Sequence, residues 1–121
     1  MSKAKELGNK GEELAVAHLK SLGYQILDLN WHSSHLELDI IAKDGDELVI
    51  VEVKARGSDS YEHPSEAVSN KKIRFLVNAA EAYIQEKDMN CDTRFDVISI
   101  IFTGKTTELE HFINAFYPPV N

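Results

Sequence analysis

Two short apolar runs, residues 36–42 and 48–54, constrain the fold of this chain most strongly. Both are rich in β-branched residues, and the polar segment Asp44-Gly45-Asp46-Glu47 between them is typical of a tight hairpin turn. We therefore expect an antiparallel hairpin over residues 36–54. Because apolar side chains occupy most positions of both runs, the two strands are expected to be buried on both faces.

Two helices and three further strands are expected around this hairpin. Residues 3–22 carry apolar side chains at helical spacing and are followed by Gly23, a typical helix stop. A second apolar stripe predicts a helix from about Ser65 to Lys87. Further strands are expected at residues 24–31, 94–102 and 107–113, with a loop over 56–64 and a turn at Gly104. This order predicts an α/β fold with a mixed central sheet of about five strands, flanked by helices.

Length and composition fit one small domain. The 121 residues are enough to bury a single core, and the 43% hydrophobic and 27% charged content is typical of soluble globular proteins. We expect residues 1–121 to form one domain, with a short proline-rich tail from about Pro118. Several charges interrupt residues 1–20, and no apolar run is long enough for a membrane span. A single cysteine, Cys91, cannot form an internal disulfide, so a cytoplasmic location is expected.

The net charge of −7 weighs against nucleic-acid binding, which usually leaves a basic footprint. The charge is uneven, however, because residues 75–121 hold three basic and seven acidic residues and so contribute −4. The segment 54–74 is the most basic part of the chain, with Lys54, Arg56, Lys71, Lys72 and Arg74. Contacts with phosphates are expected for the last four, but for the helix residues Lys71, Lys72 and Arg74 a solvated helix face remains equally open. A local basic face of this size predicts modest, salt-sensitive binding to a polyanion.

The hairpin is expected to bring carboxylates and a lysine together. A loop of two or four residues around Gly45-Asp46 places Asp39 opposite Glu52, and Glu37 opposite Lys54. A loop shifted by one residue changes these partners, but alternation of side chains still leaves all four on one face. Only a loop of three or five residues would separate Asp39 from Glu52.

Two carboxylates on one sheet face repel each other unless a cation lies between them. Hard oxygen ligands favour Mg²⁺ or Mn²⁺, which retain several waters. Lys54 lies two residues beyond Glu52 and could hold an attacking water or a phosphate, so the set fits metal-assisted hydrolysis. The alternative interpretation is a solvated sheet face with ordinary cross-strand pairs.

Glu12 is a fourth candidate. It lies at the edge of the apolar stripe of the first predicted helix, where a carboxylate faces partly inward and needs a partner. Gly8 and Gly11 precede it and weaken the helix, so close approach of another backbone or of a ligand is expected there.

The order of Glu12, Asp39 and Glu52-Val53-Lys54 resembles the PD-(D/E)xK nuclease superfamily. Within it, the chain resembles the YraN-like bacterial family, which is similar to archaeal Holliday junction resolvases. The resemblance covers about residues 8–117 and is carried by the stretches at residues 8–27, 37–56, 66–84 and 94–100.

This resemblance implies a restriction-endonuclease-like fold in which Asp39 and Glu52 bind the metal. It also implies that Lys54 is the catalytic lysine and that Glu12 is the acidic residue of the first helix. The activity implied is a Mg²⁺- or Mn²⁺-dependent endonuclease, or resolvase-like hydrolase, of branched or structured DNA, acting as a homodimer.

Two positions depart from the pattern. Leu36 stands where the relatives usually have glycine, and Leu38 stands where the superfamily has proline. Leu36 could change the bend of the strand and the approach of a substrate. A catalytically inactive nucleic-acid-binding or protein-adaptor module on the same fold is therefore the alternative function.

The remaining polar and aromatic candidates are not expected to do chemistry. Trp31 is expected in the core and not as a base-stacking platform. His32 and His35 flank a short turn and are expected at the surface. Asp96 lies in an apolar strand and is expected to pair with Arg94 or a helix terminus.

Overall fold

A computed structural model describes residues 3–57 and 69–116 of the chain. The elements follow one another as α1 (Lys3–Ser21), β1 (Gln25–Ser33), β2 (Leu36–Asp44), β3 (Glu47–Gly57), α2 (Asn70–Glu86), β4 (Thr93–Thr103) and β5 (Thr106–Phe112). Within these two ranges, no helix is long and apolar enough to cross a membrane.

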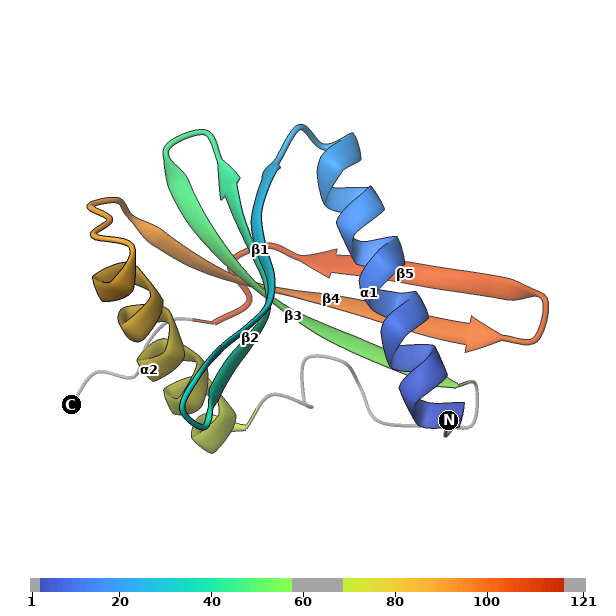
Figure 1. Ribbon diagram of the computed structural model, residues 1–121. Coiled ribbons are helices and arrows are strands. Elements are labelled where there is room, and N and C mark those ends of the chain that lie inside the picture. Colours follow the sequence, from blue (N-terminus) through green and yellow to red (C-terminus); the bar gives the residue numbers. More distant parts are fainter. Residues whose placement is uncertain (1–2, 58–68, 117–121) are drawn as a thin grey trace.

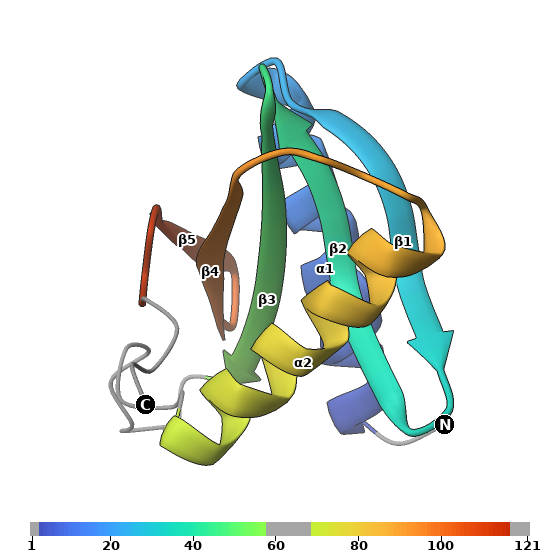
Figure 2. The ribbon, with the colours of Figure 1, turned by 90° about the vertical axis from the view of Figure 1, so that its left-hand side faces the viewer.

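The five strands form one mixed sheet in the order β1-β2-β3-β4-β5. β3 and β4 run parallel, and the other three neighbouring pairs are antiparallel. The parallel pair requires a crossover, and α2 lies within that connection. The two helices lie on opposite faces of the sheet (Figures 1 and 2). The expected α/β, restriction-endonuclease-like fold is confirmed.

The largest difference from the predicted boundaries is at the second helix. α2 begins at Asn70 because Ser69 is its N-cap, with an extended backbone and a hydroxyl that accepts the amide of Lys72 at 3.1 Å. The predicted helix start at about Ser65 was therefore too early, because Ser69 is not helical. Residues 65–68 and the tail from Pro118 lie outside the described residues.

The predicted loop over 56–64 was wrong at its first two positions. β3 continues through Arg56 to Gly57, because its parallel pairing with β4 extends to the pair Gly57 and Phe102. The remaining part of that loop lies outside the described residues.

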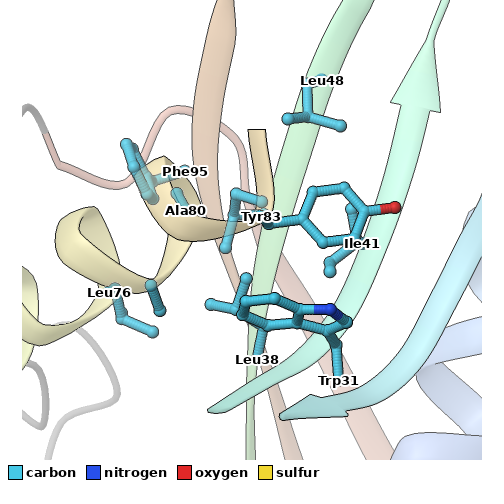
Figure 3. Close-up of a cluster of buried hydrophobic side chains, with 10 residues drawn as sticks. Trp31, Leu38, Ile41, Leu48, Leu76, Ala80, Tyr83 and Phe95 are labelled. Atoms are coloured by element: carbon cyan, nitrogen blue, oxygen red, sulfur yellow. The ribbon is translucent and has the colours of Figure 1, made fainter. Parts of the chain in front are cut away.

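The side of the sheet that α2 covers holds an aromatic-rich core (Figure 3). Trp31 and Tyr83 meet edge to face with ring centroids 5.3 Å apart, which is a favourable aromatic geometry. Their polar atoms are also satisfied, because Trp31 donates to Glu86 and Tyr83 donates to Asp28. Trp31 is thus a core residue, as predicted. The buried cluster comprises Trp31, Leu38, Ile41, Leu48, Ile50, Leu76, Ala79, Ala80, Tyr83 and Phe95.

The opposite side of the sheet packs against α1. Its buried residues are Ala15, Leu19, Tyr24, Ile40, Ala42, Val49, Val51, Ile98 and Ile100. The helix packs tightly against the sheet at Gly11, where an added Cβ would lie 2.6 Å from the Cβ of Ala55 on β3. Close approach of a backbone, expected from the glycines, is confirmed at Gly11. At Gly8 nothing lies within 4 Å of an added Cβ.

A buried polar network joins β4 to its neighbours. Arg94 and Asp96 face each other on β4 in a two-point contact with N–O distances of 2.9 and 3.0 Å. The same guanidinium donates to Asp44 and Glu47, so it ties the turn of the β2–β3 hairpin to β4. The predicted pairing of Asp96 with Arg94 is confirmed. The network also includes the Tyr24 hydroxyl, the His111 ring and the backbone amide of Asn114.

The two glycines of α1 predict opposite stability effects. Gly8→Ala should raise the free energy of unfolding by about 0.5–1 kcal/mol, because alanine has the better helix propensity and meets no neighbour. Gly11→Ala should lower it by about 1–2 kcal/mol, because the new methyl overlaps Ala55 and overpacking exceeds the propensity gain. Chemical denaturation measures both effects. The double variant Gly11→Ala/Ala55→Gly should recover much of the loss, and a destabilised variant without such recovery would contradict the contact.

Candidate active site

The site forms where the backbone ladder between β2 and β3 ends. Paired residues run from Asp44–Glu47 to Ile40–Val51, which confirms a two-residue hairpin loop. Beyond that pair, the Asp39 carboxylate accepts the backbone amide of Val53 with an N–O distance of 3.0 Å. The start of β2 and the end of β3 point away from each other (Figures 1 and 2). The Asp39 side chain therefore forms a hydrogen bond to the backbone of β3 at the point where the two strands separate.

Side-chain alternation is broken at Asp39. Leu38 and Ile40 are two residues apart, yet Leu38 packs in the core on the α2 side and Ile40 packs in the core on the α1 side. The prediction relied on regular alternation to keep four charged residues on one face. That alternation does not hold along β2. Glu37 is not opposite Lys54; its carboxylate lies 3.1 Å from the His32 ring nitrogen on β1.

Asp39 and Glu52 are nevertheless brought together. Glu52 is only 7% exposed and follows the inward-facing Ile50 on the α2 side of the sheet. Burial and the adjacent Asp39 carboxylate raise the pKa of Glu52 to about 7. Lys72 lies 3.5 Å from the Glu52 carboxylate, and together with Lys54 it offsets part of this rise. The buried Glu52 carboxylate thus lies beside the half-buried Asp39 carboxylate, and the lysines compensate their charge only in part.

Asp39 and Lys54 also line an open cleft of about 370 Å³ against α1. Glu12 of α1 lines the same cleft, so the helix and the hairpin bring their acidic residues to one place. Burial raises the pKa of Glu12, with a smaller contribution from Asp39 and an opposing one from Asn30. The lining is completed by Lys5, Gly8, Asn9, Val53, Ala55 and Arg56.

The donor set at Asp39 and Glu52 fits a hard divalent cation. Both residues offer carboxylate oxygens, and their mutual repulsion would be relieved by a charge of +2. In the part of the chain that the structure describes, no group of three or more His, Cys, Asp or Glu side chains is placed to hold a metal ion. A cation held here would therefore keep several waters, as Mg²⁺ commonly does.

The basic residues predicted to contact DNA separate into two groups. Lys72 is half-buried and contacts Glu52, so the structure places it at the acidic site. Lys71 and Arg74 are exposed near the start of α2. Arg56 lines the cleft beside Lys54. His32 and His35 are exposed, as predicted for a surface turn.

Sequence reasoning missed Asn30 and the cleft residues Lys5 and Asn9. Asn30 is on β1, far from Glu12 in sequence, yet its amide donates to the Glu12 carboxylate. A polar residue between Leu29 and Trp31 only weakly indicates a functional role, because polar residues are common on edge strands.

Comparison with known proteins identifies the family. Residues 11–100 match the model described as "Uncharacterised protein family UPF0102". The chain belongs to this family. It is similar to a UPF0102 protein of Bacteroides thetaiotaomicron, at 43% identity with 99% of each chain covered. UPF0102 proteins of Parabacteroides distasonis and Christiangramia forsetii are each 42% identical, with 97–98% of each chain covered. The YraN-like family resemblance is confirmed.

The Glu52 environment of this UPF0102 protein predicts an unusual pH dependence of stability. The pKa of Glu52 lies near 7 in the folded protein and near its ordinary 4.5 in the unfolded chain. The folded state therefore binds more protons between these values, and Glu52 should stabilise the protein as pH falls from about 8 to about 5. The full effect would be about 3 kcal/mol, following the rise in pKa. Urea denaturation in metal-free buffer measures it.

The Glu52→Gln variant isolates this effect, because glutamine does not titrate. The difference between the two pH profiles also removes other groups, such as His18, whose pKa burial lowers with the opposite effect on stability. Asp39→Asn should give an intermediate profile, because burial still acts on Glu52. It should not reduce stability at pH 8, since asparagine can still accept the Val53 amide. Parallel profiles for wild type and Glu52→Gln would contradict the burial of Glu52 beside Asp39.

Proposed function

We propose that this UPF0102 protein is a Mg²⁺- or Mn²⁺-dependent endonuclease that hydrolyses phosphodiester bonds in branched or otherwise structured DNA. One observation carries the proposal: the buried Glu52 carboxylate lies beside Asp39, which lines a cleft together with Lys54 and Glu12. Three elements of the fold supply these four side chains. Like charges that are held close together, although their repulsion lowers the stability of the fold, are typical of a functional site.

Each of the four residues has a distinct task in this proposal. Asp39 and Glu52 hold the cation, which when bound supplies a Lewis acid and an activated water. Lys54 places a positive charge in the cleft, where it stabilises the charge that develops on the phosphate. Glu12 adds a further carboxylate to the cleft, where it would help to hold the cation through a water that the cation retains.

The charge distribution supports a restricted mode of DNA binding. Arg56 lies in the cleft, and Lys71 and Arg74 are exposed near the start of α2. Because the whole chain carries −7, its general attraction to duplex DNA is weak, and contacts must come from this local basic region. A branched substrate presents several phosphate backbones to so small a surface. Two copies of the chain would supply the two cuts that a symmetric junction needs, so we also propose a homodimer in the cytoplasm.

The alternative is a DNA-binding or adaptor module without turnover. The observation that favours it is the contact between Lys72 and Glu52, because this lysine partly neutralises the carboxylate pair without a metal. The −7 charge favours it as well. Lys72 contacts only one of the two carboxylates in the described structure, which is why the enzymatic function is preferred.

Substitution of cleft and surface lysines should separate catalysis from binding. Lys54→Ala should lower the cleavage rate at saturating DNA by about a hundredfold or more and spare most of the binding, because Lys54 acts on developing charge. Lys71→Ala/Arg74→Ala should instead weaken binding to all substrates and make the salt dependence shallower by about one unit of slope per lost contact. Labelled branched, flapped, single-stranded and duplex DNAs, incubated with Mg²⁺ or Mn²⁺, provide the assay. Lys72 is left unchanged because it contacts Glu52.

The outcomes discriminate between the two functions. If no DNA is cut, yet DNA binds and Lys54→Ala weakens binding as Lys71→Ala/Arg74→Ala does, the protein is a binding module. If DNA neither binds nor is cut at low salt with metal present, both nucleic-acid functions fail and an adaptor role remains. Light scattering of the free protein tests the homodimer separately.

A further inference from the structure

Asn30 connects the edge of the sheet to the candidate active site. It lies on β1 between Leu29 and Trp31, which pair with Ile40 and Leu38 on β2. This register places Asn30 beside Asp39. The Asn30 side-chain amide donates to one oxygen of Glu12 with an N–O distance of 2.7 Å. Asn30 therefore lies next to one proposed site residue and bonds a second.

The backbone at Asn30 has an unusual conformation for a strand. Its φ of 51° lies in the left-handed region, and among the described non-glycine residues with positive φ it is the one inside a strand. The strand changes faces here: Leu29 lies beside Val16 and Glu12 of α1, whereas Trp31 packs in the core on the α2 side. β2 makes the same change at its neighbour Asp39. Asparagine tolerates this backbone better than most residues, so its presence fits both the turn of the chain and the bond to Glu12.

We propose that Asn30 is a positioning residue for Glu12. A glutamate side chain on a helix surface has several rotatable bonds, and the Asn30 amide holds one of its two oxygens. The second oxygen then remains for the cleft that Glu12 shares with Asp39 and Lys54. This inference rests on the proposed metal-dependent nuclease function. Groups that orient the residues of a metal site commonly affect metal affinity or activity by about 10- to 100-fold.

The test is a double-mutant cycle between positions 30 and 12. Asn30→Gly removes the amide but permits the left-handed backbone, and Glu12→Ala removes the partner. In the wild-type background, Asn30→Gly should weaken Mn²⁺ binding, measured by calorimetry, by about tenfold. It should also lower the cleavage rate at saturating DNA and leave the half-saturating DNA concentration unchanged. In the Glu12→Ala background, the same substitution should change Mn²⁺ affinity less than twofold.

Control variants separate positioning from folding. Asn30→Ala should melt at a lower temperature than Asn30→Gly, because alanine tolerates positive φ less well. If Asn30→Gly does not fold, the side-chain amide signals of Asn30 in nuclear magnetic resonance spectra of the wild type and of Glu12→Ala replace it. These signals should shift when Glu12 is removed, and unshifted signals would overturn the inference.

The remaining outcomes distinguish this inference from the function on which it rests. Equal losses of Mn²⁺ affinity in both backgrounds would mean that Asn30 acts through the fold alone, which overturns the positioning role. An unchanged Mn²⁺ affinity in Asn30→Gly also overturns the positioning role. The nuclease function still stands in that case if the wild-type protein binds Mn²⁺ and cuts DNA. A wild-type protein that neither binds Mn²⁺ nor cuts DNA overturns the nuclease function and the positioning role together.

Discussion

The hydrogen bond from the Val53 amide to the Asp39 carboxylate is the contact on which the site depends. It occurs where backbone pairing between β2 and β3 stops, so a side chain takes over from the strand as acceptor. An acceptor carboxylate at this position is held against β3 while its own strand, which stays paired with β1, separates from β3. The separation opens the cleft toward α1 and keeps Asp39 beside Glu52. This hydrogen bond therefore places a carboxylate of the candidate site where the pairing of the two strands ends.

The surrounding core makes the closeness of these carboxylates persistent. Strands β2 and β3 are packed on both faces, and the helix that carries Glu12 meets β3 at Gly11 and Ala55 without room for a methyl group. Close-packed interiors resist small displacements, so the strands that carry the two carboxylates cannot move apart without disturbing the core. Lys72 on α2 supplies a partial counter-charge to Glu52. The site is thus electrostatically strained and structurally fixed, which is the combination expected of preorganised groups.

Local pattern was sufficient for much of this fold. The polar segment Asp44–Glu47 and its apolar flanks predicted the hairpin, with a two-residue loop at Gly45-Asp46 among the expected registers, and the apolar stripes predicted both helices. Regular alternation, however, could not foresee the change of faces at Asp39, because a local backbone irregularity leaves no periodic signal. Lys72 was assigned to DNA for a similar reason: its contact with Glu52 depends on how α2 crosses the sheet. Asn30 was missed because its partner is distant in sequence.

The buried Arg94 network fixes the turn of the hairpin, so a small rotation at the turn becomes a larger displacement farther along β2. Arg94 grips the turn through Asp44 and Glu47, whereas Asp39 lies five residues away along β2, roughly 17 Å at the usual rise of a strand. A rotation of a few degrees at the turn would therefore move Asp39 by about 1 Å. Displacements of that size can cost a reaction about a hundredfold in rate. The placement of the two carboxylates relative to β4 is consequently influenced from the opposite end of the hairpin, by a guanidinium that contacts neither of them.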